Sequence, residues 1–400
     1  MRRFLFVVPP LAGHINPTVG VAAALAERGH QVAWAGCAEV VRRLIGPQAT
    51  VFGCAGQLPG EGGVHRPPQI RGPAALKFLW ERFLAPLAEA MVPGVQVAVE
   101  RFAPDVLVVD QQAIAGALVA EQMGLVWATS ATTSAELTDP LSGMPKVGAW
   151  VRELMADLRW RFGNPAAASD LRFSPYLVLA FTTPALVGPA THLGGQIRFV
   201  GPSIATRPGA SDFPWDWLDG ERPAALISLG TVNADVGALF LGECVRALRD
   251  RHGWQAVIVD PDGALGAVPG HVLVQRAVPQ LQLLPHVDAV VCHAGHNTVC
   301  EALSHGLPLV VAPIRDDQPI VAQQVVDAGA GIRLRFTRAT AAQIGLAVEA
   351  VLTDPSYRQA ARRVQESFRA AGGASAAAGH LEALAARGAR TVITERTATC

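Results

Sequence analysis

Short apolar runs alternate with longer stretches of helical periodicity along the first half of the chain. Runs of this kind are typical of strands that are buried on both faces of a sheet. The expected strands are residues 3–10, 31–35, 105–110, 125–129, 176–180 and 197–200. The expected helices are residues 18–28, 74–101 and 112–123, with a loop at 11–17. Strand, loop, helix and strand in this order favour a parallel sheet, so we expect an α/β fold.

Two segments of the first half have a less regular pattern. Residues 53–72 are rich in Gly and Pro and indicate a long surface loop, which in a compact domain is usually functional or mobile. Residues 131–172 contain helical segments with Trp150 and Trp160, which we expect to line a groove.

The pattern restarts after residues 206–223, which are dense in Pro, Gly and Asp, lack any period and form the best linker candidate. Further strands are expected at 225–228, 255–259, 287–292 and 307–314, and helices at 238–249, 357–369 and 377–386. The chain therefore divides into two α/β halves of similar length. We assign residues 1–205 to a first domain, 206–222 to a linker, 223–370 to a second domain and 371–400 to a C-terminal helix and tail.

Composition narrows the class of protein. Half of the 400 residues are hydrophobic and 16% are charged, which excludes a disordered chain. The formal net charge is zero, so nothing favours nucleic acid or an anionic membrane as a partner. The six cysteines are scattered without a CxxC pair, as in a reduced, cytoplasmic protein. No apolar run reaches the ~18 residues of a membrane helix, so no membrane span is expected.

The segment 287–318 carries the clearest chemistry. A Val-rich strand ends at His293, Ala294 and Gly295, and a helix should begin near Asn297 or Thr298. A strand, a loop of small residues and a helix direct backbone N–H groups and the positive end of a helix dipole to one point, which suits a phosphate. The next apolar run ends at Asp317 and Gln318, beside that site, because neighbouring parallel strands end at the same edge.

A zinc site is the alternative for this segment, because it contains two cysteines and two histidines, Cys292, His293, His296 and Cys300. However, adjacent residues of a strand point to opposite faces, which separates Cys292 from His293. Cys300 falls inside the following helix, where a small buried residue is the ordinary expectation. We therefore expect no metal here, and we assign no chemistry to His296.

An ordered set of motifs covers about forty residues. It consists of Val278-Pro279-Gln280, Leu284-Pro285-His286, His293-Ala294-Gly295-His296-Asn297-Thr298, Glu301 and Asp317-Gln318. The set resembles the nucleotide-sugar signature of family-1 glycosyltransferases, and within them the bacterial macrolide-type and carotenoid glucosyltransferases. The resemblance implies the GT-B architecture, in which two Rossmann-like domains with parallel sheets face one another and the C-terminal helix crosses back to the first domain.

The resemblance also implies roles for particular residues. Asn297 and Thr298 would bind the phosphates, Glu301 the ribose hydroxyls, and Asp317 and Gln318 the transferred sugar. The full donor-binding set is Gly13, Gly230, Thr231, Arg276, Val278, Gln280, His293, Gly295, Asn297, Thr298, Glu301, Asp317 and Gln318. Three parts of this set have a structural alternative: a helix capping box for Thr298 and Glu301, a strand-ending turn for Gly230 and Thr231, and a polar turn for Asp317 and Gln318.

His14 and Asp110 form the candidate catalytic pair. Each follows or ends a predicted parallel strand, so both side chains reach the edge where α/β active sites lie. An imidazole oriented by a buried carboxylate is a general-base arrangement. On the resemblance, His14 falls on the family's catalytic histidine and Asp110 on its partner aspartate.

One position departs from the family pattern. The aromatic residue that commonly stacks on the base is here Ala277, so stacking must come from Arg276 or from elsewhere. No Asp-x-Asp motif is present where a diphosphate would need a metal, so we expect neither metal nor cofactor. The leaving diphosphate would be neutralised by His293, backbone N–H groups and the helix dipole.

These observations predict an inverting glycosyltransferase that moves a hexose from a nucleotide sugar to a hydroxyl of a hydrophobic small molecule. Glu301 and the sugar-binding pair favour UDP-glucose over a TDP-sugar. We expect a monomer or a weak homodimer. A GT-B nucleotide-sugar epimerase and a non-catalytic nucleotide-sugar-binding helper protein stay open as alternatives.

Overall fold

The computed structural model describes residues 1–54, 70, 72–189, 191–205, 212–230 and 234–397. The chain forms two compact units. Unit 1 contains Met1–Phe181, Ala190–Pro208 and Ala371–Cys400, and unit 2 contains Thr182–Pro189 and Gly209–Ala370. Most of the expected long loop, residues 55–69 and 71, lies outside the described residues. Of the expected linker, residues 206–211 lie outside them, and the described part, 212–222, contains the short helical turn η4 (Trp215–Trp217).

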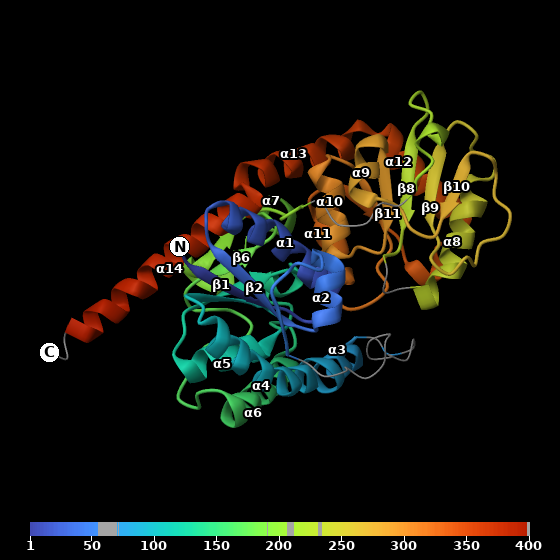
Figure 1. The fold of residues 1–400 in the computed structure, drawn as a ribbon. Coiled ribbons are helices and arrows are strands. Elements are labelled where there is room, and N and C mark those ends of the chain that lie inside the picture. The colour runs from blue at the N-terminus through green and yellow to red at the C-terminus, as the bar shows by residue number, and fades with distance from the viewer. Residues whose placement is uncertain (55–69, 71, 190, 206–211, 231–233, 398–400) are drawn as a thin grey trace. The chain divides into compact units, whose positions relative to one another are not determined.

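Unit 1 is built on a seven-stranded parallel sheet with the order β3-β2-β1-β4-β5-β6-β7 (Figure 1). Its strands are β1 (Arg3–Val7), β2 (Gln31–Gly36), β3 (Val51–Gly53), β4 (Val106–Asp110), β5 (Trp127–Ala131), β6 (Val178–Ala180) and β7 (Ile197–Phe199). The buried, Val-rich β4 explains why the hydrophobic pattern located this sheet.

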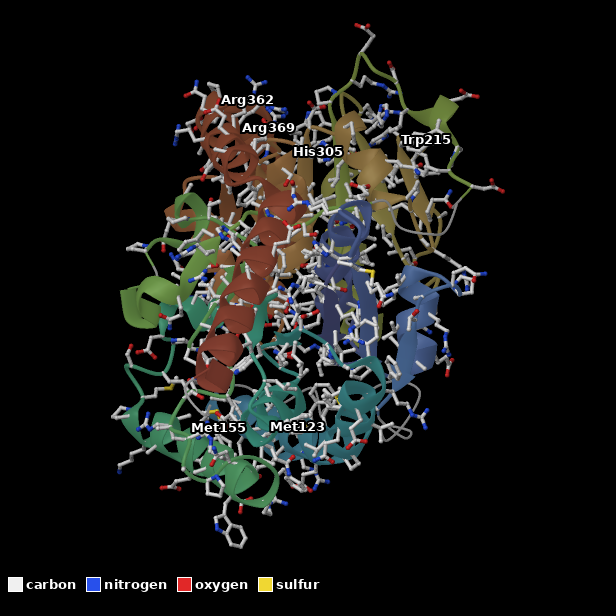
Figure 2. All side chains as sticks on the ribbon, turned by 60° about the vertical axis from the view of Figure 1, so that its left-hand side comes forward. Met123, Met155, Trp215, His305, Arg362 and Arg369 are labelled. Atoms are coloured by element: carbon white, nitrogen blue, oxygen red, sulfur yellow. The ribbon has the colours of Figure 1, made fainter. Side chains whose placement is uncertain are left out.

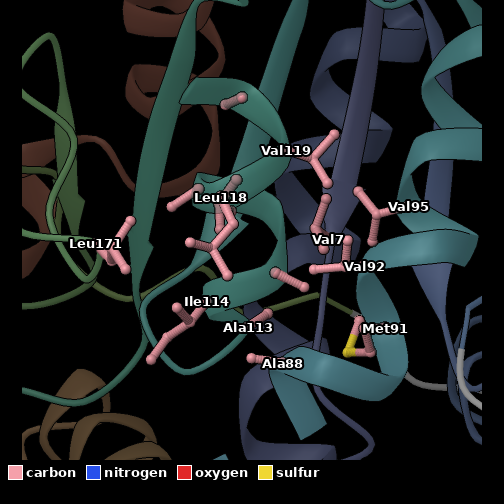
Figure 3. Close-up of a cluster of buried hydrophobic side chains, with 14 of the residues drawn as sticks. Val7, Ala88, Met91, Val92, Val95, Ala113, Ile114, Leu118, Val119 and Leu171 are labelled. Carbon is pink, nitrogen blue, oxygen red and sulfur yellow. The ribbon is translucent and has the colours of Figure 1, made fainter. Parts of the chain in front are cut away.

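Helices cover both faces of this sheet. They are α1 (Ala12–Glu27), α2 (Ala38–Ile45), α3 (Pro73–Leu79), α4 (Ala85–Phe102), α5 (Ile114–Met123), α6 (Pro145–Phe162) and α14 (Gly373–Thr397), with short helical turns η1 (Trp80–Leu84), η2 (Ala135–Thr138) and η3 (Thr191–Gln196). On one face, Met91 and Val95 of α4 and Ile114 and Leu118 of α5 pack in one core cluster with Val7 of β1 (Figure 3). The opposite face packs against α1 and α14.

The C-terminal helix α14 belongs to unit 1, as the fold prediction expected. Ala377, Ala378 and Leu381 are fully buried in the same core cluster as Ile15 and Val21 of α1. Burial of this apolar stripe fixes the last helix on the first sheet. In contrast, residues 182–189, which the sequence placed within 1–205, cluster with unit 2 through α7 (Pro184–Val187).

Two local expectations were wrong. The helix α1 begins at Ala12 rather than at Thr18, so His14 lies in its first turn and Pro17 lies inside the helix. Pro17 has no N–H, which costs this helix one hydrogen bond. The two tryptophans expected in a groove are also placed differently, because Trp160 is 74% exposed and Trp150 packs against the core of unit 1.

Among the described residues, the stretch Ala74–Phe102 is the one long and apolar enough to cross a membrane by length and composition. Half of its most apolar window is buried inside the protein. Trp80, Leu87 and Met91 of this stretch belong to the core cluster of unit 1, which accounts for its apolar composition.

Unit 2 contains a six-stranded parallel sheet with the order β10-β9-β8-β11-β12-β13. Its strands are β8 (Ala224–Ser228), β9 (Gln255–Val259), β10 (Val272–Gln275), β11 (Ala289–Cys292), β12 (Leu309–Val311) and β13 (Gly331–Arg333). Its other helices are α8 (Ala234–Leu248), α9 (Gln280–Leu283), α10 (His296–Ser304), α11 (Gln318–Asp327), α12 (Ala341–Thr353) and α13 (Pro355–Ala371), with the turns η4 (Trp215–Trp217), η5 (Leu284–His286) and η6 (Phe336–Arg338). The two edge strands β10 and β13 were not predicted.

The helix α13 fixes the C-terminal end of α10. Gln365 donates a hydrogen bond of 2.7 Å to the carbonyl of Ser304. Figure 2 shows Arg369 of this helix near His305, which directly follows α10. Burial lowers the pKa of His305 and the charge of Arg369 lowers it further, so the positive charge near this end of α10 at neutral pH comes from Arg369 and not from His305.

Candidate functional site

The predicted site residues fall into two groups, one at the carboxyl end of each sheet. In unit 1 they flank the point between β1 and β4 where the strand order reverses. In unit 2 they flank the corresponding point between β8 and β11. Such points are where open α/β sheets form ligand sites.

His14 and Asp110 are in contact, as their positions after neighbouring strands predicted. The Nδ1 atom of His14 lies 2.9 Å from Oδ1 of Asp110. The aspartate side chain is fully buried, whereas the histidine side chain is 14% exposed. The imidazole is therefore held from the protein side by a carboxylate.

A third residue, Thr132, completes this cluster, and the sequence reasoning missed it. Its Oγ1 lies 2.8 Å from Nδ1 of His14 and donates a hydrogen bond of 2.6 Å to Oδ2 of Asp110. Thr132 follows β5, in which Ser130 pairs with Asp110 of β4. The signal that could have found it is this register, because parallel neighbours end at the same edge.

In unit 2, two glycines surround the ring of His293. A Cβ atom at Gly230 would lie 2.7 Å from its Cε1, and one at Gly295 would lie 2.4 Å from its Nε2. Ala294, which lies between His293 and Gly295 in the sequence, adopts a left-handed conformation with φ of 65°. Non-glycine residues rarely adopt it, and such strain is concentrated at functional sites. The loop thus has small residues because the histidine ring occupies the space.

The electrostatic state of His293 differs from the one expected. Its side chain is buried, and burial lowers its pKa from 6.5 to about 4. The ring is therefore neutral at pH 7 and would act on a phosphate as an N–H donor rather than as a positive charge. Its Nδ1 has no hydrogen-bond partner among the described residues.

The helix α10 begins at His296, one residue before the expected range, with Gly295 as its N-cap. No side chain caps it there, and Asn297 and Thr298 occupy its first turn. A capping box led by Thr298 is therefore not formed, which removes the structural alternative for that residue. Backbone N–H groups at such a terminus, together with the helix dipole, suit an anion.

Glu301 and Gln280 were both predicted to bind the donor, and the structure brings them together. Nε2 of Gln280, at the start of α9, donates a hydrogen bond of 2.6 Å to Oε2 of Glu301. Glu301 is 3% exposed, one helical turn from the start of α10. The amide fixes one carboxylate oxygen and thereby orients the other.

The segment after β12 positions Asp317 and Gln318. Oε1 of Gln318 accepts hydrogen bonds from the backbone of Ile314 and Arg315, at 2.9 and 3.0 Å. These bonds fix the turn, in which Asp316 is left-handed with φ of 55°. Gln318 therefore has a structural part through its oxygen, and its Nε2 and the half-buried Asp317 are the groups suited to a sugar hydroxyl.

The remaining predicted residues are less constrained. Arg276 is exposed after β10. Its guanidinium lies 3.3 Å from the point where a Cβ atom added at Gly263 would stand. Val278 is half-buried just before α9, and Gly13 is exposed in the first turn of α1. Thr231 lies outside the described residues.

The cysteine and histidine cluster at α10 has no metal geometry. Sγ of Cys300 lies 3.5 Å from Nε2 of His296, a contact within one helix. Within the described part of the chain, no three or more His, Cys, Asp or Glu side chains are placed to hold a metal ion.

Known proteins are similar to this chain in sequence. Residues 256–384 match the Erythromycin biosynthesis protein CIII-like C-terminal domain family. 4'-Demethylrebeccamycin synthase of Lentzea aerocolonigenes is 31% identical, over 92% of this chain and 96% of that protein. Zeaxanthin glucosyltransferase of Pantoea ananas is 27% identical, over 96% of each chain.

Solved structures agree. The crystal structure of CalG4, the calicheamicin glycosyltransferase, matches with a TM-score of 0.76 and 25% identity, over 97% of this chain and 99% of that one. The GT-B fold, the resemblance and the enzyme class expected from the sequence are thereby confirmed. The chain is a nucleotide-sugar glycosyltransferase and belongs to the family-1 glycosyltransferases of natural-product and antibiotic biosynthesis.

Proposed function

We propose that this enzyme inverts the anomeric centre and transfers a hexose, with UDP-glucose as the preferred donor, to a hydroxyl of a hydrophobic small molecule. The observation that carries the proposal is the contact of His14 with Asp110. Because a carboxylate can only accept a hydrogen bond, it favours the tautomer with the proton on Nδ1. Nε2 is then the basic nitrogen.

In this mechanism, Nε2 of His14 removes the proton of the acceptor hydroxyl as its oxygen attacks the anomeric carbon from the side opposite the diphosphate. Asp110 stabilises the imidazolium that forms. One displacement in line inverts the anomeric configuration. This use of the histidine as a general base is typically worth ~10²–10⁴ in rate.

The leaving diphosphate is stabilised from unit 2 without a metal ion. The first N–H groups of α10 and its dipole would face the phosphates, and the neutral His293 would add an N–H donor. The absence of a side chain at Gly230 and Gly295 leaves room for this ring. This arrangement needs no cofactor.

The donor preference follows from Glu301. Its carboxylate, oriented by Gln280, suits both the 2′- and 3′-hydroxyls of a ribose, and a 2′-deoxy TDP donor lacks one of them. Asp317 and Gln318 favour a sugar that keeps neighbouring hydroxyls, because a buried polar group left unpaired costs ~1–3 kcal/mol. Zeaxanthin glucosyltransferase, a relative, carries glucosyl transfer to zeaxanthin in its name, which supports a glucosyl donor and a small-molecule acceptor.

The test of the mechanism separates turnover from donor binding. His14→Ala should reduce kcat by ~10²–10⁴ while the dissociation constant for UDP, measured by calorimetry, stays within about twofold. His252→Ala, which removes an exposed histidine of unit 2, is the matched control and should keep both values. An equal loss of donor affinity and turnover in His14→Ala would identify His14 as a donor ligand and refute its role as a base.

The donor assignment has its own test. Wild type should bind UDP more tightly than TDP by about tenfold, the value of one hydrogen bond to a charged group. Glu301→Ala should weaken UDP binding and abolish this preference. Tighter binding of TDP by the wild type, or an unchanged preference in the variant, would contradict UDP as the donor nucleotide.

A further inference from the structure

Thr132 touches both members of the catalytic pair. We propose that Thr132 is a positioning residue whose hydroxyl, with its direction set by Asp110, enforces the Nδ1–H tautomer of His14. The inference rests on the proposed role of His14 as the general base, and it goes beyond the histidine–aspartate pair. It makes Asp110 act on the imidazole by two routes, one direct and one through the threonine.

The direction of the hydrogen bonds follows from counting protons. The Thr132 hydroxyl has one proton and two close neighbours, Oδ2 of Asp110 at 2.6 Å and Nδ1 of His14 at 2.8 Å. The carboxylate can only accept, so the proton goes to Oδ2. The lone pair of Oγ1 then faces Nδ1, which must carry a proton to pair with it. Thr132 is 3% exposed, so water does not offer an easy alternative.

The two carboxylate oxygens of Asp110 have separate partners. Oδ1 accepts from the backbone N–H of Gln112 at 2.8 Å and faces Nδ1 of His14 at 2.9 Å. Oδ2 accepts from Thr132. Because the Gln112 N–H requires an acceptor, an asparagine at position 110 would keep its oxygen at the Oδ1 site. Its NH2 group would then stand where Oδ2 stands, opposite Thr132.

This substitution reverses the hydrogen bond at Thr132. The asparagine NH2 donates to Oγ1, so the threonine proton must turn to its other neighbour, Nδ1 of His14. A donor at that point stabilises the tautomer with the proton on Nε2, which has no lone pair left to accept the acceptor's proton. Asp110→Asn would therefore be damaging because Thr132 is present, and not only because a charge is lost.

The expected result is that a second substitution, at Thr132, restores part of the turnover lost in Asp110→Asn. Thr132→Val alone should lower kcat by about tenfold, the value of one hydrogen bond. Asp110→Asn should lower it by ~10³–10⁴ through the wrong tautomer. In the double variant, valine cannot donate to Nδ1, while the asparagine oxygen still accepts from Nδ1–H. The double variant should therefore turn over at least tenfold faster than Asp110→Asn.

A direct readout distinguishes this inference from the proposed function. In protein labelled with ¹⁵N-histidine, the His14 signals, assigned by their absence in His14→Gln, should show Nδ1–H in wild type and in the double variant and a shift to Nε2–H in Asp110→Asn. Thr132→Ser keeps the hydroxyl and should behave as wild type. If His14→Ala keeps its turnover, the proposed base is wrong, whereas these tautomer shifts would still test Thr132.

Three results would overturn the inference. The first is a double variant that is no faster than Asp110→Asn, since independent structural losses add. The second is an unchanged His14 tautomer in Asp110→Asn. The third is a Thr132→Val variant with tenfold weaker UDP-sugar binding and normal kcat, which would make Thr132 a ligand contact. Thermal unfolding of each variant shows that any lost activity is not lost folding.

Discussion

His293 should make the folded protein less stable as the pH falls below neutral. Burial lowers the pKa of His293 to about 4. The backbone of Ser228 acts in the opposite direction, and the charge of Arg315 adds to the lowering. A histidine in the unfolded chain titrates near ~6.5, so between these values the unfolded state binds a proton that the folded state does not. The contribution of neutral His293 to the free energy of unfolding is therefore fully present above the pKa of the unfolded chain and is lost as the pH falls toward 4.

The size of the effect follows from the two pKa values. At about 1.4 kcal/mol per pKa unit, complete protonation would cost roughly 3 kcal/mol. About 2 kcal/mol of this falls between pH 7.5 and pH 5, because the folded-state ring is still mostly neutral at pH 5. For a protein whose total stability is ~5–15 kcal/mol, this is a measurable fraction.

Urea unfolding of the full chain at pH 7.5 and pH 5 measures this change in the free energy of unfolding. Other titrating groups contribute as well, so the quantity to compare is the loss between the two pH values in wild type and in His293→Gln. The wild type should lose about 2 kcal/mol more than the variant. His252→Gln, at an exposed histidine, should follow the wild type. Equal losses in wild type and His293→Gln would show that the ring is solvated or already charged, and the neutral-donor role would be wrong.

Further predictions concern the donor half of the site. Gly295→Ala should weaken UDP binding by tenfold or more, because the added Cβ would displace the His293 ring. The control is Gly242→Ala in α8, where nothing lies within 4 Å of an added Cβ. This control should keep UDP binding and stabilise the folded protein by up to ~1 kcal/mol. Calorimetry and unfolding curves measure both, and a normal UDP affinity in Gly295→Ala would contradict the packing argument. Turnover should survive treatment with a chelator; a loss that magnesium or manganese restores would show that the phosphates need a metal.

The sequence predicted the local structure around His293 well because its parts are close together along the chain. The strand before His293, the small residues after it and the helix of Glu301 form one continuous segment, so a local pattern determines their order in space. The prediction was weaker where tertiary contacts decide. The charge state of His293 depends on burial, and Gln318 is partly committed to its own turn through its oxygen.

The cluster of His14, Asp110 and Thr132 is different, because its three residues come from distant parts of the chain. His14 and Asp110 were found since each stands at the end of an apolar run, and the family resemblance marked both. Neither an apolar run nor the family resemblance points to Thr132, and only the pairing of Asp110 with Ser130 places it beside the other two residues. The start of α1 was missed for a related reason, since Pro17 normally argues against a helix interior but here lies within one.

The two groups of predicted site residues follow one topological rule, each within its own unit. In unit 1, His14 follows β1 and Asp110 ends β4, the two strands between which the order of the sheet reverses. In unit 2, Gly230 follows β8 and His293 follows β11, the equivalent pair. At such a point the loops diverge to opposite faces and leave room above the strand ends. In the first sheet this room holds an imidazole in contact with a carboxylate, and in the second it holds a buried, neutral imidazole beside the start of a helix. One residue type thus has two environments, because a carboxylate contacts it in one unit and burial removes it from water in the other.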